Sequence, residues 1–315
     1  MEYPNPKIRF YQVRTFGEKL NITFDFFREA WKPLLKSTLY LILPICLIQA
    51  FGINAIMRFS FAMGASSGAG SDFWQDSDIW KFFINYSVYM LCYLVGSCLL
   101  SALIYTLMQE YQRRETRLLD IQLSDFKEPL IKNTWKMLRM SLLFFGVILL
   151  VALIIGILAA MSSWTLILTL PVMVVGLIAV IVPVSLAPAF YIFEDMPLGA
   201  TIRKAFRYGF AAWGGTFGIL FVLGLLGNII SSVTMMPWYI LTVIGSFFSI
   251  TDPSSGVHTS ILYQFSTYIL GIIQSYGTYI GATLSVVGTA FQYFHLREKN
   301  EGVTVNENIQ NFYRL

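Results

Sequence analysis

Six long apolar stretches follow one another along this chain and constrain its fold more than any other feature; they occupy residues 34–57, 82–108, 141–161, 164–193, 213–235 and 261–294. Each reaches the ~20 residues that an α-helix needs to cross the hydrocarbon core of a bilayer. Only 13% of the 315 residues are charged, against about 25% in soluble domains. The sequence therefore predicts an all-α, polytopic transmembrane helix bundle of about six spans, forming one membrane domain over residues 1–315.

A further apolar stretch at residues 237–250 has only the length of a re-entrant or interfacial helix. Trp238 and Tyr239 suit the headgroup level, where amphipathic rings gather. We interpret this stretch as part of the outer loop between the fifth and sixth spans. A seventh full span is the alternative, and it would place the last three basic residues on the opposite side of the membrane.

The basic residues predict the orientation of the spans. Twenty of the 22 Lys and Arg residues precede the first span, follow the last, or lie in the loops after the second and fourth; only Arg58 and Lys81 fall on the other side. The positive-inside bias thus predicts a multi-pass protein of a bacterial inner membrane with both termini cytoplasmic. No cleaved signal peptide is expected, so the first span would direct insertion. The net charge of +4 is too small to suggest nucleic acid.

The three basic inner segments share one plan, an amphipathic helix that leads directly into a span. A tryptophan stands at each junction, where it would anchor the helix at the headgroup boundary: Trp31, Trp135 and Trp213. We interpret the chain as three units, residues 14–108, 118–193 and 197–296, each an interfacial helix followed by a transmembrane hairpin. Alternatively, any polytopic protein has basic inner loops and interfacial tryptophans.

Two basic clusters are candidate contacts for anionic lipid headgroups: Arg113, Arg114 and Arg117, and Arg203, Lys204 and Arg207. Each such residue near a membrane surface contributes about 1 kcal/mol of attraction. Alternatively, the clusters serve topology alone, and the two roles are compatible.

The stretch from Pro188 through Glu194, Ala200 and Phe206 to Trp213 has a proline-containing span end, an acidic residue and an A-x-x-x-K-A-F helix. It resembles the membrane domain attached to some bacterial glycerophosphodiester phosphodiesterases, and related stand-alone membrane proteins. The phosphodiesterase barrel and its His-Arg-Gly signature are missing, and the two histidines, His258 and His295, do not precede Arg-Gly. The resemblance implies architecture and not activity.

Small and polar residues follow one face of the sixth span with gaps of three and four; the polar members are Gln264, Thr267, Gln274, Thr278 and Ser285. We call this face of the sixth span, with its small and polar residues, the polar seam. Helix–helix packing is the favoured interpretation, because small residues let two helices approach closely. The alternative is a wet or headgroup-lined cavity.

No constellation of catalytic, cofactor-binding or metal-binding residues is expected. Residues 64–68 match G-x-S-x-G, but in an expected flexible loop and not on a strand-to-helix turn. Ser97 or Ser246 with His258 or His295 would form an intramembrane hydrolase, the third-ranked hypothesis. The leading hypothesis is a non-enzymatic protein that binds membrane lipids or, as a scaffold, another membrane protein. A transporter or permease for a lipidic or small neutral solute is the main alternative.

Overall fold

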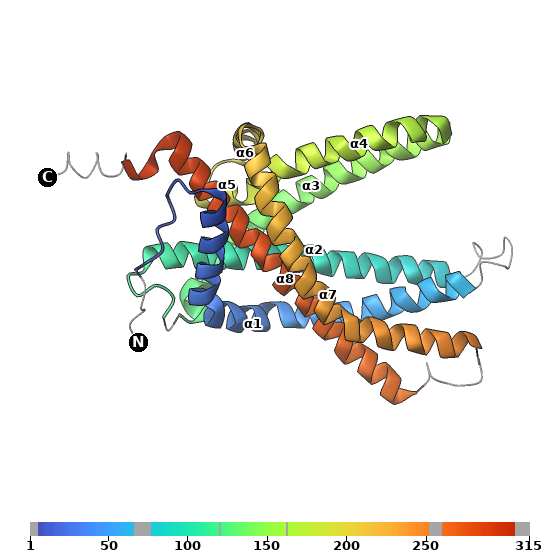
Figure 1. Ribbon diagram of the computed structural model, residues 1–315. Helices are drawn as coiled ribbons and strands as arrows, with labels where there is room; N and C mark the ends of the chain where they lie inside the picture. Colours follow the sequence, from blue (N-terminus) through green and yellow to red (C-terminus); the bar gives the residue numbers. More distant parts are fainter. Residues whose placement is uncertain (1–5, 66–76, 120, 162, 252–259, 306–315) are drawn as a thin grey trace. The chain divides into compact units, whose positions relative to one another are not determined.

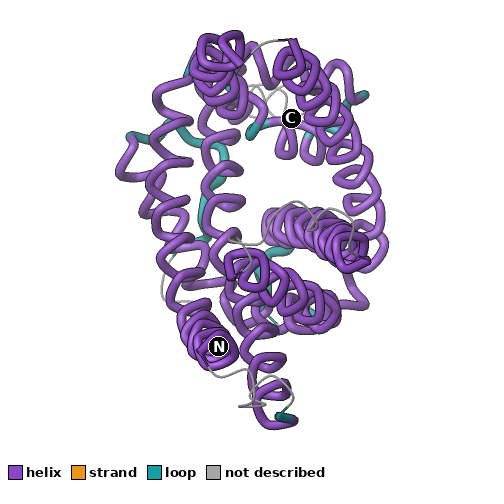
Figure 2. The backbone as a smooth tube through the Cα atoms, turned by 90° about the vertical axis from the view of Figure 1, so that its right-hand side faces the viewer, coloured by secondary structure: helices purple, strands orange, loops and turns teal. Residues whose placement is uncertain are grey.

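The computed structural model describes residues 6–65, 77–119, 121–161, 163–251 and 260–305. Within these ranges the chain forms helices joined by short loops and no strand (Figures 1 and 2). The α-helices are α1 (Phe16–Ala65), α2 (Ser77–Arg113), α3 (Lys127–Met161), α4 (Ser163–Val184), α5 (Ala187–Phe193), α6 (Leu198–Ala211), α7 (Trp213–Thr251) and α8 (Ile261–Glu301). A 3-10 turn, η2 (Leu123–Phe126), precedes α3. The predicted all-α fold is confirmed.

Five stretches of helix are long and apolar enough to cross a membrane: Phe16–Ser60, Ile79–Arg113, Leu123–Ile157, Pro171–Phe193 and Trp213–Phe248. They identify the chain as a multi-pass membrane protein. Each contains one of the first five predicted spans or most of it. α8 has 41 residues, enough to cross a bilayer by length. Its assignment as the sixth span stays a prediction.

The expected outer-loop helix at residues 237–250 was wrong, because α7 continues without interruption from Trp213 to Thr251 and includes Pro237. A proline inside a helix removes one backbone hydrogen bond. Among apolar surroundings every other backbone N–H and C=O group still needs a partner, and a continued helix supplies it. The demand for backbone hydrogen bonds therefore outweighs the one bond lost at Pro237.

The chain forms two compact units, each assembled from separate segments. Unit 1 comprises Met1–Leu35, Ser101–Gly224 and Leu284–Leu315, and unit 2 comprises Lys36–Leu100 and Leu225–Thr283. Nineteen of the 22 Lys and Arg residues fall in the ranges of unit 1. The three repeat units predicted from the sequence follow a different division and stay a prediction.

The core of unit 1 is built around the C-terminal part of α8. Ten consecutive residues, 287–296, are all buried. A helix that is buried on every side has other elements packed around its whole circumference. Phe291 and Phe294 contact Phe10 at ring-centroid distances of 5.3 and 5.0 Å, and Phe10 stacks on Tyr111 of α2 at 5.4 Å. The N-terminal segment and the end of α8 thus share one aromatic core.

The hairpin of α3 and α4, seen side by side in Figure 1, exposes apolar side chains along α3. Ile148, Leu150 and Leu153 are each more than 60% exposed. In water, a patch of this kind would be unfavourable by about 25 cal/mol for each Å² of apolar surface, whereas lipid solvates it. This exposure agrees with the assignment of α3 as a membrane span.

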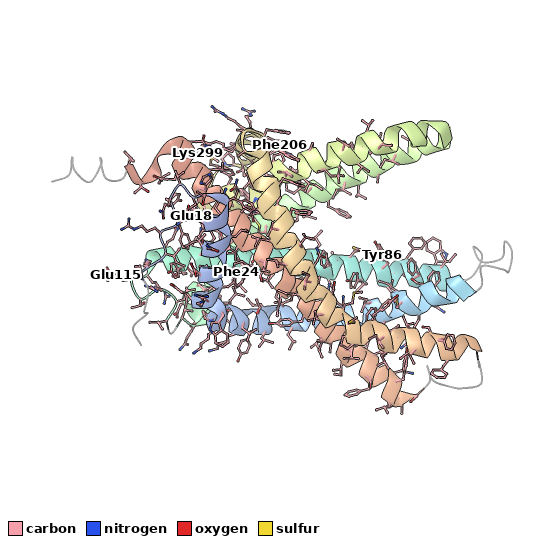
Figure 3. The ribbon with its side chains drawn as sticks, viewed as in Figure 1. Glu18, Phe24, Tyr86, Glu115, Phe206 and Lys299 are labelled. Atoms are coloured by element: carbon pink, nitrogen blue, oxygen red, sulfur yellow. The ribbon has the colours of Figure 1, made fainter. Side chains whose placement is uncertain are left out.

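α6 packs closely against the end of α4. A methyl group added at Gly209 would lie 2.4 Å from Pro183 Cα, so only glycine permits this approach. Thr201, Ala205 and Gly209 form the buried face of α6, at intervals of four residues. Phe206, labelled in Figure 3, stacks on the exposed Phe210 at 5.8 Å. The small buried residues of α6 thus lie on a different face from the exposed Phe210.

Candidate functional site

The candidate site is a pocket of about 620 Å³ in unit 1, which we call the Lys132 pocket. It is lined by Lys132, Trp135, Lys136, Arg139, Tyr191, Asp195 and Met196. The first four residues come from α3, and the other three come from the end of α5 and the turn that follows it. Three basic side chains face one acidic side chain, so the lining carries a net positive charge.

The α3 side of the pocket follows from residue spacing. Residues separated by three, four and seven positions lie on one face of an α-helix, and Lys132, Trp135, Lys136 and Arg139 have this spacing. The Lys132 side chain is 64% exposed, whereas that of Lys136 is only 12% exposed. Arg139 is exposed, and no carboxylate of the described residues lies within ion-pair distance of it. Its guanidinium is therefore available to an anion.

Asp195 forms the acidic side of the pocket. Its carboxylate accepts a hydrogen bond from Lys132 Nζ at 3.0 Å and another from Lys136 Nζ. These hydrogen bonds, that from Lys136 above all, lower the pKa of Asp195 below its ordinary value. The backbone at Asp195 has a φ of +51°, a left-handed conformation that Asp and Asn tolerate better than most residues. This turn directs the carboxylate toward α3.

Glu194 belongs to a second group of charges, which we call the Glu194 cluster: Glu194, Lys204, Tyr208, Tyr293, Arg297 and Glu301. The Glu194 carboxylate, 8% exposed, lies 2.7 Å from Lys204 Nζ and 3.0 Å from Arg297 Nη1. Glu301 completes the cluster, at 2.7 Å from both cations. The cluster therefore joins the turn after α5 to α6 and to the end of α8.

The cluster also affects the ionisation of Glu301. Burial on its own would raise the pKa of this carboxyl group. Hydrogen bonds from Lys204 and Tyr208 and the charge of Arg297 outweigh that effect, and the pKa of Glu301 lies below its ordinary value. Glu301 thus stays ionised and keeps the cluster charge-balanced at neutral pH.

The structure places the predicted headgroup contacts in two groups. Four of them form ion pairs inside unit 1: Arg113 with Glu110, Arg114 with Glu110 and Asp125, Arg117 with Glu29 at 3.1 Å, and Lys204 within the Glu194 cluster. Arg113 is 81% exposed and lies 3.6 Å from Glu110, and Arg203 and Arg207 are exposed on α6. Lys132, Lys136 and Arg139 were not among the predicted contacts. Their spacing around Trp135 was the available signal.

The three predicted interfacial anchors differ in their surroundings. Trp31 and Trp135 are 54% and 59% exposed. Trp213 is half-buried, and its indole N–H donates to the carbonyl oxygen of Ala179 in α4 at 3.2 Å. The two exposed rings are the ones free to lie among headgroups.

In unit 2 the polar seam of α8 packs largely against α7 and α1. A methyl group at Gly281 would lie 2.4 Å from the carbonyl oxygen of Gly227, and one at Gly277 would lie 2.0 Å from Thr234 Oγ1. Thr267 and Gln274 are buried, and the hydroxyls of Thr267 and Thr278 donate to carbonyls of their own helix. These contacts favour packing for this part of the seam.

The two ends of the polar seam differ. Gln264 lines a smaller pocket of about 260 Å³ in unit 2, together with Phe51, Asn54, Ala55, Arg58 and Tyr268. Ser285 is half-buried and its carbonyl accepts a hydrogen bond from Thr289 in unit 1. The close-packed region thus lies between these ends.

The hydrolase candidates have local structural roles where they are described. Ser97 Oγ donates to the carbonyl oxygen of Leu94 in its own helix, and Ser246 is buried. His295 Nδ1 accepts a hydrogen bond from the backbone N–H of Arg14 at 3.0 Å. His258 and residues 66–68 of the G-x-S-x-G match lie outside the described residues.

The buried position of His295 makes unit 1 sensitive to acid. Burial and the charges of Lys19, Lys299 and Arg14 lower the pKa of His295 from 6.5 to about 4. Lys299, labelled in Figure 3, follows it by one turn of α8. An unfolded chain would bind a proton below pH 6.5, and the folded chain would not until about pH 4. The contribution of His295 to stability is thus complete above pH 6.5 and is lost as the pH falls to 4.

We therefore expect His295 to account for a loss of about 3 kcal/mol in unfolding free energy between neutral pH and pH 4. Thermal unfolding of the detergent-solubilised protein, measured across this range, checks it. The His295→Asn variant keeps a hydrogen-bond acceptor and has no titrating ring, so its stability should change less with pH. An equal acid dependence in wild type and variant would contradict the assignment.

Comparison with models of protein families, with curated proteins and with solved structures found no match for this chain.

Proposed function

We propose that this chain is a non-enzymatic lipid-binding protein of a bacterial inner membrane, and that the Lys132 pocket holds the phosphate of an anionic lipid. The observation that carries the proposal is the pocket itself: three basic side chains and two aromatic rings gathered at one end of a membrane span. Lys and Arg in this position attract anionic headgroups, and aromatic side chains prefer the same depth.

The helix that forms the pocket also offers a surface to acyl chains. Continuing the spacing of Lys132 and Arg139 along α3 leads to Leu143, Gly146 and Leu150. Leu143 and Leu150 are exposed apolar residues. A lipid with its phosphate at Arg139 would lay its chains along this face. The pocket and the face together match the amphipathic form of a phospholipid.

The same proposal places unit 1 toward the cytoplasm. The positive-inside rule assigns basic residues to that side, and most of them fall in unit 1. The described ends of the chain also meet there: Thr304 Oγ1 donates to the carbonyl oxygen of Tyr11 at 3.4 Å, and His295 contacts Arg14. This contact supports placing the two ends on one side.

We further propose that the chain follows the architecture of the membrane domain found with glycerophosphodiester phosphodiesterases. The Pro188–Phe206 stretch that suggested it forms α5, the Glu194–Asp195 turn and most of α6. The end of α5 and the turn supply one wall of the Lys132 pocket. In this view the domain is a membrane scaffold that binds lipid and, through its exposed hairpin, another membrane protein. The hairpin is α3 with α4, whose apolar exposure is described above.

A double variant, Lys132→Gln with Arg139→Gln, tests the lipid site. Each charge contributes about 1 kcal/mol, so we expect the affinity for vesicles containing anionic phospholipid to fall about 25-fold. Binding of the purified protein in nanodiscs of defined lipid composition, or retention of lipid in native mass spectrometry, provides the measurement. Both residues are exposed, and thermal unfolding would show whether the variant is folded.

The matched control is Arg203→Gln with Arg207→Gln, which removes the same charge from the exposed face of α6. If the lipid is held only by a general surface attraction, both double variants should lose the same affinity for anionic lipid. A localised site predicts that only the pocket variant loses most of its bound lipid. Equal losses would remove the case for the pocket.

A further inference from the structure

Resting on the proposed function, we infer that Asp195 is a built-in competitor for the lipid phosphate, and that the pocket therefore takes a lipid ending in a phosphomonoester. The Asp195 carboxylate accepts hydrogen bonds from both Lys132 and Lys136, in the place between them that an anion would take. The carboxylate offers two oxygens and one negative charge to these ammonium groups. A ligand therefore displaces Asp195 and binds tightly only if it offers the two ammonium groups more negative charge or more acceptor oxygens than the carboxylate does.

The two kinds of lipid phosphate differ in what they offer. A phosphodiester headgroup has one negative charge and two free oxygens, so exchanging it for Asp195 brings little gain. A phosphomonoester has three terminal oxygens and a charge of about −1.5 to −2 near neutral pH. It can satisfy both lysines and still reach Arg139, which has no carboxylate partner among the described residues. The chemistry of the lining thus favours the monoester.

The turn holds Asp195 in place for this role. Its left-handed backbone is fixed on one side by Glu194, whose carboxylate is buried in the Glu194 cluster, and on the other by Pro197 at the start of α6. The Asp195 side chain itself is 61% exposed, so it can move away from the lysines without unfolding the turn. Lys136 has a second contact, 5.5 Å from the ring centroid of Tyr191, that keeps it at the pocket when Asp195 leaves.

The inference is tested with vesicles that contain either phosphatidic acid or phosphatidylglycerol at matched surface charge. We expect the wild-type protein to bind the phosphatidic acid vesicles about fivefold more tightly, as one further ion pair would give. The preference should shrink as the pH falls below the second phosphate pKa of about 6. Competition by inorganic phosphate distinguishes the sources: weak competition supports a lipid ligand, and strong competition would point to a free phosphate compound and overturn the lipid assignment.

The Asp195→Asn variant separates the competitor from the site. Asn also tolerates the left-handed conformation, so the fold should be kept. We expect it to bind both lipids about fivefold more tightly than wild type, so that phosphatidylglycerol reaches the affinity that phosphatidic acid has for wild type. Asp25→Asn, which removes an equal charge from an exposed pair with Arg28, should change neither affinity.

The outcomes separate this inference from the proposed function. The inference would be overturned if Asp195→Asn bound lipid with unchanged affinity, or if the wild-type protein bound the two lipids equally. The site itself would still stand if the Lys132→Gln, Arg139→Gln variant lost lipid binding. Undiminished lipid binding by that double variant would instead overturn the proposed function.

Discussion

Replacement of Glu194 by Gln should lower the unfolding free energy of the detergent-solubilised protein by about 3 kcal/mol, because it removes the more buried of the two carboxylates that balance Lys204 and Arg297. The Glu194 carboxylate is nearly enclosed and contacts Lys204, Arg297 and Tyr293. Glu301 alone would then face two positive charges. Chemical or thermal unfolding followed by tryptophan fluorescence measures the change.

The control for this prediction is Asp25→Asn, which breaks an ion pair between two exposed side chains. Pairs of this kind contribute about 0–1 kcal/mol, since water and salt screen them. We also expect the double variant Glu194→Gln with Lys204→Met to recover part of the loss, because it removes one of the two cations that Glu301 would be left to balance. A stability equal to that of wild type in Glu194→Gln would show that the cluster does not hold unit 1 together.

Introducing a large side chain at Gly281 should be equally damaging, through packing in unit 2. Even a methyl group there would lie 2.4 Å from the carbonyl oxygen of Gly227, and α7 would have to move away from α8. Overpacking of a tight contact costs about 1–3 kcal/mol, and Gly281→Leu belongs at the upper end because the neighbour is backbone and cannot rotate away. The thermal unfolding of this variant should show the loss.

Gly146→Ala is the matched control for the glycine contact. An added methyl at this position of α3 meets no atom within 4 Å. Alanine forms helices more readily than glycine, so the variant should be unchanged or more stable by about 0.5–1 kcal/mol. A similar loss in both variants would mean that helix geometry alone, and not the α7–α8 contact, explains the Gly281→Leu result.

The helical architecture could be predicted from the sequence because it depends on local patterns. Long apolar runs predicted five spans that correspond to helices long and apolar enough to cross a membrane. The small residues of the sixth span predicted a close helix contact, which the structure shows at Gly281. The continuation of α7 through Pro237 was missed. The length of residues 237–250 and the positions of Trp238 and Tyr239 indicated a separate interfacial helix, whereas the continuation of α7 depends on whether the backbone can find other hydrogen-bond partners in lipid.

The candidate site was less predictable because it depends on pairings between distant segments. Glu194 and Arg297 are about a hundred residues apart in the sequence, and Lys132 and Asp195 are 63 apart. The sequence alone did not distinguish the basic residues of unit 1 that have carboxylate partners from those that do not. Only the fold shows that Arg114, Arg117 and Lys204 have carboxylate partners while Arg139 faces the pocket.

The enclosure of residues 287–296 has a consequence for biogenesis. Ribosomes deliver α8 after every other element of unit 1, yet those elements surround it. Earlier helices can enter the bilayer one after another. Until α8 has been synthesised, however, the elements of unit 1 lack the helix around which they pack. Nascent unit 1 therefore leaves the apolar surfaces that pack on residues 287–296, including one side of Phe10, uncovered until α8 is synthesised.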